Sequence, residues 1–172
     1  MSSNNCQNNM QMIIKLSNMS TRAIIFLKGQ NAAFDVIKYD HDHKGALFAA
    51  QAVGFPLEQT VKTLVVALGD KRHALALMPG DRELDLKRMA KACKIKRAGM
   101  ASPATAERLT GYKVGGISPF GLTSPLPAVM DSRLLDYDCV LINGGQRGTM
   151  LEMSPGDIAR LLEGTIADIA RL

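Results

Sequence analysis

Lys62 is the first residue whose type and position could serve chemistry, because it interrupts a run of apolar and β-branched residues from Thr60 to Leu68. A charge inside such a run must either face solvent or meet an anionic or carbonyl group. Lysine is also common on exposed sheet edges, where it discourages pairing with another chain. From its surroundings alone, Lys62 is therefore either an outward-facing strand lysine or a ligand-binding group, and both interpretations stay open.

Two glycine pairs, Gly115-Gly116 and Gly144-Gly145, are the next candidates. Because they lack side chains, such pairs can bring backbone N–H groups close to a ligand, as in anion-binding nests and oxyanion holes. Ordinary turns use the same residues. The two glycine-rich loops therefore form a site only if the fold brings them together.

Ser118 lies in a segment, Gly116 to Phe120, that nearly matches the Gly-x-Ser-x-Gly nucleophile elbow. Phe120 replaces the second glycine, which the sharp strand-to-helix turn of that motif requires. We therefore interpret Ser118 as a turn serine before a proline, and not as the nucleophile of a catalytic triad.

Several large enzyme classes are excluded because the sequence lacks their motifs: the Gly-x-x-x-x-Gly-Lys-Ser/Thr phosphate loop, His-Glu-x-x-His and Cys-x-x-Cys. His41 and His43 have no second cluster at metal-ligand spacing, so they are interpreted as solvated loop histidines. The odd number and wide spacing of Cys6, Cys93 and Cys139 indicate reduced thiols. We expect neither a metal nor a cofactor.

The composition is that of an ordinary globular protein, with 172 residues, 47% apolar and 22% charged. No run approaches the roughly 20 apolar residues that cross a bilayer, and we expect a cytoplasmic protein without a membrane partner. Residues 1–19, rich in Asn, Ser and Met, are predicted to be a disordered extension of one domain, 20–172.

A net charge of +5 favours an anionic partner. Between Arg82 and Arg97 there are seven basic and two acidic residues, which could bind a phosphate backbone or simply form a solvated helix face. The candidates for nucleic-acid contact are Lys87, Arg88, Lys91, Lys94, Lys96 and Arg97.

Hydrophobic periodicity and capping residues predict helices interspersed with strands. The expected helices cover 20–29, 47–53, 84–93, 103–110 and the segment after Ser154. The expected strands cover 34–40, 60–68, 73–78, 128–131, 139–143 and 149–153. The hairpin-length connections favour an α+β fold with a mixed sheet over a doubly wound parallel one. The segment 111–127 is expected to be a long ordered loop.

Several ordered motifs together carry a resemblance to a known family. They are Tyr39-Asp40-His41-Asp42, Val61-Lys62-Thr63-Leu64, Leu84-Asp85-Leu86-Lys87, the run from Gly111 to Pro119, Gly144-Gly145-Gln146-Arg147-Gly148 and Ala167-Asp168-Ile169-Ala170. From about Ser20 to Arg171 the chain resembles the YbaK/EbsC proteins, relatives of the editing domain inserted into bacterial prolyl-tRNA synthetases.

The resemblance implies a curled mixed β-sheet flanked by helices, with a pocket for the aminoacylated end of a transfer RNA. Lys62 matches the essential lysine of the family, which selects the ligand-binding interpretation, and Gly116 is expected to take part in the chemistry. Asn143 stands where relatives have serine. The implied substrate-binding residues are Tyr39, Thr63, Gly115, Ile117, Ser118, Asn143, Gly144 and Gly145.

The implied activity is deacylation of cysteine misattached to tRNA(Pro). The thiol of the substrate attacks its own ester, Lys62 clamps the substrate, and backbone N–H groups near Gly116 stabilise the oxyanion. Two alternatives remain: a deacylase for alanine or another small amino acid, and a non-enzymatic module that binds tRNA or a synthetase. Prolyl-tRNA synthetase is a candidate partner.

Overall fold

The computed structural model describes residues 20–172, so the predicted extension at 1–19 and Cys6 lie outside the described residues. The α-helices are α1 (Arg22–Gly29), α2 (Ala46–Val53), α3 (Leu86–Ala92), α4 (Pro103–Thr110) and α5 (Pro155–Leu162). Two short 3₁₀ helices are η1 (Leu57–Gln59) and η2 (Ser132–Asp136). The strands are β1 (Asp35–Lys38), β2 (Val61–Gly69), β3 (Arg72–Pro79), β4 (Glu83–Leu84), β5 (Gly99–Met100), β6 (Ala128–Asp131), β7 (Val140–Gln146), β8 (Thr149–Met153), β9 (Thr165–Ala167) and β10 (Ala170–Arg171).

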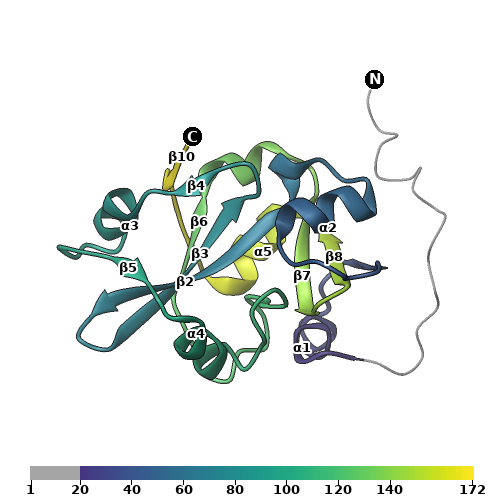
Figure 1. Ribbon diagram of the computed structural model, residues 1–172, viewed down its shortest axis with the longest axis horizontal. Coiled ribbons are helices and arrows are strands. Elements are labelled where there is room, and N and C mark those ends of the chain that lie inside the picture. The colour runs from purple at the N-terminus through teal and green to yellow at the C-terminus, as the bar shows by residue number, and fades with distance from the viewer. Residues whose placement is uncertain (1–19) are drawn as a thin grey trace.

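Three β-sheets form the framework of the described residues (Figure 1). The largest has the order β5-β2-β3-β6-β9, with antiparallel pairing at β5-β2 and β2-β3 and parallel pairing at β3-β6 and β6-β9. The second is antiparallel, in the order β1-β8-β7, and the third pairs β10 with β4. A parallel bridge between Thr60 and Leu141 links the first two sheets. The predicted mixed α+β architecture is confirmed, although its strands form separate sheets and not one continuous sheet.

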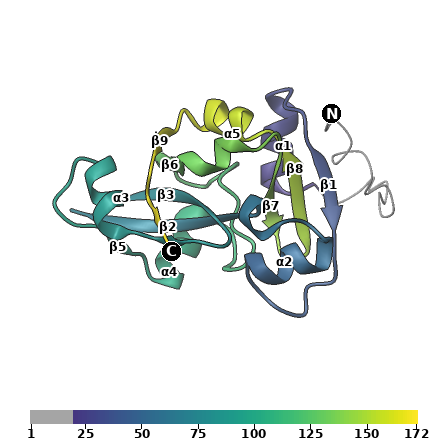
Figure 2. The same cartoon turned by 90° about the horizontal axis from the view of Figure 1, so that it is seen from above.

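The strands bury side chains on both of their faces because residues alternate between faces along a strand. On one face, Val61, Val65 and Leu77 join α1, α4 and α5 in the main core. On the other face, Val66 and Met78 pack against α3 and the end of the chain. A smaller cluster on that second face, around Leu141, lies under α2. In both views α1 and β8 lie toward one end of the molecule, and α3 lies toward the other (Figure 1, Figure 2).

The predicted elements agree with the structure except at their ends. The first helix is capped by Thr21 rather than Ser20, because the Thr21 side chain accepts a hydrogen bond from the Ile24 N–H. The strand predicted over 34–40 is confined to β1, and the helix predicted from Leu84 begins at Leu86, after the Asp85 cap. No helix or strand occurs in 111–127, as predicted. None of the helices described is long and apolar enough to span a bilayer.

Candidate active site

Lys62 is the second residue of β2 and lies opposite Met78 of β3. Paired residues of neighbouring strands share a face, so Lys62 lies on the face that packs against α3. Its ammonium donates a hydrogen bond to the carbonyl of Arg82, in the loop between β3 and β4. Burial lowers the pKa of Lys62, and the nearby charges of Asp81 and Glu83 offset part of that effect.

Thr63 lies on the opposite face of β2, opposite Leu77 and toward the main core. Its hydroxyl is buried and makes no hydrogen bond to any residue within 20–172. The structure therefore does not bring the Thr63 and Lys62 side chains together, although the shared motif placed both in one pocket. Strand alternation, readable from the sequence, separates neighbouring residues in this way.

Asn143 lies on the same face as Lys62. A parallel bridge pairs Thr60, just before β2, with Leu141 of β7, so these two side chains share a face. Side chains alternate between faces, so Lys62 and Asn143, each two residues further along, lie on that same face. The Asn143 amide donates to the Gly115 carbonyl (3.3 Å), and its oxygen accepts from the Gly145 N–H (2.8 Å). Asn143 thus ties the two glycine-rich loops together on the face that it shares with Lys62.

Gly116 is buried against the end of β7, the strand that contains Gly144 and Gly145, and against the start of the turn that follows it. A Cβ at Gly116 would lie 2.9 Å from the backbone nitrogen of Arg147. The Gly116 N–H already donates to the Lys113 carbonyl (2.8 Å). The N–H of Gly116 is therefore already engaged in a backbone hydrogen bond, so an oxyanion role would fall to other N–H groups near it.

Arg147, which is not among the predicted site residues, also holds the loop that contains Gly116. Its Nε and Nη2 both donate to the Val114 carbonyl, at 3.0 and 2.7 Å. The glycine-rich motif that contains Arg147 gave no sign of this contact, because the two residues are 33 positions apart.

Ser118 is fully buried, and its hydroxyl accepts a hydrogen bond from the Phe120 N–H (3.3 Å). This is the geometry of the turn serine that the sequence favoured. The expected contact between the Ser118 side chain and a substrate is not supported, because the hydroxyl faces its own turn. Ile117 is partly buried and packs against the main core.

Tyr39 directly follows β1, and its N–H donates to the Gly148 carbonyl (3.1 Å). Burial raises the pKa of its hydroxyl. Its ring is tilted against that of Phe48 on α2, with 6.2 Å between the centroids, and the ring of His43 meets Phe48 edge-on at 5.2 Å. Phe48 is not among the predicted site residues, and its only signal in the sequence is an aromatic residue at the start of a predicted helix.

A cavity of about 280 Å³ lies next to Tyr39. It is lined by Lys38, Tyr39, Asp40, His41, Gln146, Arg147, Gly148 and Thr149. It lies between the end of β1 and the turn that joins β7 to β8.

The predicted nucleic-acid contacts lie on α3 and in the segment after it. Lys87, Lys91, Lys94, Lys96 and Arg97 are exposed. Arg88 is exposed as well, but its guanidinium also donates to the Asp168 carboxylate (2.8 Å) and the Ala170 carbonyl (2.9 Å). All six residues stay predicted tRNA contacts, and Arg88 has an additional role within the chain.

Metal-binding clusters are not seen in the part of the chain that the structure describes: no three His, Cys, Asp or Glu side chains there come together to hold an ion. Cys93 and Cys139 form no disulfide. Burial raises the pKa of the Cys93 thiol.

The comparison with known families decides which proteins share this arrangement. The model of the aminoacyl-tRNA editing domain matches residues 43–161, which include Lys62, Gly116 and Asn143. The chain belongs to the aminoacyl-tRNA editing domain family. The resemblance to the YbaK/EbsC proteins is confirmed, and the family acts on aminoacylated transfer RNA.

Named relatives of this editing domain differ in the substrates that their names carry. The chain is 33% identical over 131 residues, 76% of its length and 80% of the relative, to a putative Cys-tRNA(Pro)/Cys-tRNA(Cys) deacylase, EbsC, of Enterococcus faecalis. It is 30% identical over 155 residues, 87% and 92% of the two chains, to the multifunctional Ser/Thr-tRNA deacylase ProXp-y of Escherichia coli.

The fold of this editing domain also matches a solved structure. A putative trans-editing enzyme for prolyl tRNA synthetase superimposes with a TM-score of 0.81 and 30% sequence identity, over 90% of this chain and all of that one. Tyr39 and the segment from Ala167 to the end of the chain lie outside the residues that the family model matches.

Proposed function

We propose that this protein is a trans-editing deacylase that releases cysteine misattached to tRNA(Pro). The observation that carries the proposal is the position of Lys62, a half-buried ammonium on the same face as Asn143, which links both glycine-rich loops. A half-buried cation on the same face as two convergent loops is suited to an anionic or carbonyl-bearing ligand. The ester that joins an amino acid to the terminal ribose is such a ligand.

In this proposal Lys62 positions the substrate and stabilises charge. An ammonium has three donors and no acceptor, so while protonated it cannot remove a proton from a nucleophile. The hydrogen bond to the Arg82 carbonyl uses one donor and leaves others for the substrate. With the Gly116 N–H engaged to Lys113, Lys62 is the group we assign to the carbonyl oxygen as negative charge develops.

The nucleophile in this proposal is the thiol of the substrate. Its sulfur forms a bond to the ester carbonyl carbon, the bond from that carbon to the ribose oxygen breaks, and the thiol proton passes to the departing oxygen. Water then opens the cyclic thioester and releases free cysteine. The protein supplies orientation and electrostatics, which can account for large rate effects when the reacting atoms are held close.

Serine or threonine is the second candidate for the amino acid removed. It is favoured by the similarity to ProXp-y, which extends over a larger share of this chain than the similarity to EbsC. The hydroxyl of either residue occupies the place of the thiol. Alanine lacks a nucleophile there, and fit to a pocket distinguishes a methyl group by only about 1–3 kcal/mol.

The test is deacylation of Cys-tRNA(Pro), Ser-tRNA, Thr-tRNA and Ala-tRNA(Pro) by the purified protein and by Lys62→Ala. We expect Cys-tRNA(Pro) to be cleared fastest and Lys62→Ala to fall to the uncatalysed rate. Lys28→Ala, at an exposed position of α1, is the matched control and should behave as wild type.

Mass spectrometry at early times should detect the cyclic thioester from Cys-tRNA(Pro). Faster release of serine or threonine would transfer the proposal to the second candidate. Background rates on every substrate with the wild-type protein would refute the enzymatic proposal itself.

A further inference from the structure

Asp131 is a fully buried carboxylate at the end of β6, outside the site described above. One oxygen accepts hydrogen bonds from the Ile169 and Ala170 N–H groups, both at 2.9 Å. The other accepts from the Arg133 N–H at 3.1 Å, and the Arg133 guanidinium lies 3.1 Å from both oxygens. A buried carboxylate requires this many partners, so Asp131 fixes whatever donates to it.

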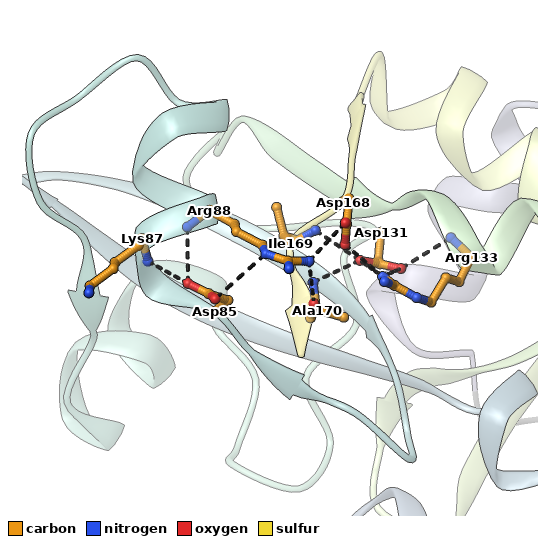
Figure 3. Close-up of polar contacts among 8 residues, drawn as sticks. All are labelled: Asp85, Lys87, Arg88, Asp131, Arg133, Asp168, Ile169 and Ala170. Atoms are coloured by element: carbon orange, nitrogen blue, oxygen red, sulfur yellow. Dashed lines mark hydrogen bonds and ion pairs between the residues drawn. The ribbon is translucent and has the colours of Figure 1, made fainter. Parts of the chain in front are cut away.

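What it fixes is the last segment of the chain, residues 167–172, which we call the C-terminal strap. Figure 3 shows Arg88 and Arg133 reaching the strap from opposite sides, with Asp168 between them. Asp168 binds both guanidinium groups at 2.8 Å. The hydrogen bond from Arg133 lowers the pKa of Asp168, which favours the ionised carboxylate that both guanidinium groups bind.

The C-terminal strap in turn holds the loop that receives Lys62. Ala170 and Arg171 pair with Leu84 and Glu83 as the β10-β4 ladder, and the Asp85 N–H donates to the Ile169 carbonyl (2.8 Å). The residue before β4 is Arg82, whose carbonyl accepts the Lys62 ammonium.

Starting from Asp131, hydrogen bonds lead through the strap to β4, and the backbone that enters β4 carries the Arg82 carbonyl that binds the lysine. The strap pairs with β4, whereas Asn143 and Arg147 hold the glycine-rich loops, so the two supports use different residues.

We propose that Asp131 is a positioning residue for Lys62: it holds the C-terminal strap against β4 and thereby sets the place of the Asp81–Glu83 loop against the lysine. This inference rests on the proposed function only for its kinetic readout. The strap lies beyond the residues matched by the family model, and it adds to Lys62 a support that comes from the end of the chain.

Asp131→Asn is the informative variant. An amide has the same shape but presents one acceptor oxygen, and its NH₂ then faces either the two strap N–H groups or the Arg133 donors. Asp168→Asn loosens the strap from outside, where the carboxylate is 53% exposed and the fold is not at risk. Asp157→Asn, which removes an exposed ion pair with Arg160 on α5, is the matched control.

The first readout is the titration of Lys62 itself, followed by NMR of ¹³C-lysine and assigned by the signal missing from Lys62→Met. Burial is the larger of the opposing effects on the Lys62 pKa. If the loop is released and the ammonium becomes more solvated, the pKa of Lys62 should therefore rise toward that of an ordinary lysine. The upward shift of the Lys62 pKa should be largest in Asp131→Asn, smaller in Asp168→Asn and absent in Asp157→Asn. All three variants are measured well below their melting temperatures.

The second readout is deacylation, where we expect kcat to fall about 10- to 100-fold in Asp131→Asn with an unchanged Kd for tRNA. A lower melting temperature with an unmoved Lys62 titration and unchanged kcat would overturn the proposal and leave Asp131 a purely structural residue. If the wild-type protein deacylates nothing, the proposed function fails, while the Lys62 titration still decides the role of the strap.

Discussion

Replacement of Gly116 by alanine tests whether the two glycine-rich loops must touch. The new Cβ would lie 2.9 Å from the Arg147 nitrogen and 3.1 Å from the Gln146 carbonyl carbon, both backbone atoms that no side-chain rotation can move. Carbon contacts are optimal near 3.5–4.0 Å, so the loops must separate by roughly 0.5–1 Å. The Asn143 bond to the Gly115 carbonyl is already 3.3 Å long and should break.

The expected cost follows from that separation. Overpacking of this kind costs about 1–3 kcal/mol of unfolding free energy. For a domain of this size the loss lowers the melting temperature by roughly 2–12 °C. A displacement near 1 Å at a site that works by orientation reduces deacylation about 100-fold.

Calorimetry and deacylation of Cys-tRNA(Pro) measure the two effects separately. Gly29→Ala is the control, because a Cβ there meets no atom within 4 Å and alanine favours the end of α1. Wild-type melting and activity in Gly116→Ala would show that the loops do not pack as described. A lower melting temperature with full activity would show that their contact is structural only.

Three further outcomes are expected. Thr63→Val removes a buried hydroxyl that has no hydrogen-bond partner within residues 20–172, so the melting temperature should rise by about 2–4 °C without loss of activity; reduced activity would reveal a substrate contact. Lys62 binds its proton less tightly when folded, so wild-type stability should rise with pH between the lowered pKa and 10.5. Lys62→Met should lose this rise and should be at least as stable as the wild type at pH 7. Thermal denaturation of both proteins across that pH range measures this, and the same pH dependence in both would contradict it. Alanine at Lys94, Lys96 and Arg97 should make the salt dependence of tRNA binding shallower by up to about 0.9 per residue, and an unchanged slope would exclude them from the interface.

The helices and long strands could be predicted because their signals are local. For α4, Ser102 caps the start, Pro103 fits the first turn and Gly111 takes the left-handed conformation that ends it. By contrast, β4 and β10 are two residues long and exist only because the end of the chain returns to residues 83–84. No local pattern encodes such a pairing.

The candidate site shows the same division. Lys62 could be found as a charge in an apolar strand, and alternation alone could have separated it from Thr63. The contact of Asn143 with Gly115 joins residues 28 positions apart, and Arg88 meets Asp168 across 80 positions. From the sequence, Arg88 was indistinguishable from the exposed lysines around it, because only the fold brings its acidic partner close.

Two independent supports therefore converge on one lysine, and they should fail in different ways. The glycine-rich loops, held by Asn143 and Arg147, shape the space beside Lys62, so damage to them should reduce turnover without changing the lysine's own titration. The Asp131 support sets the segment Asp81–Glu83, whose two carboxylates act on the lysine pKa and whose Arg82 carbonyl binds its ammonium. Damage there should change the titration and turnover together. Gly116→Ala and Asp131→Asn, assayed side by side, separate orientation of the substrate from the electrostatics of the lysine.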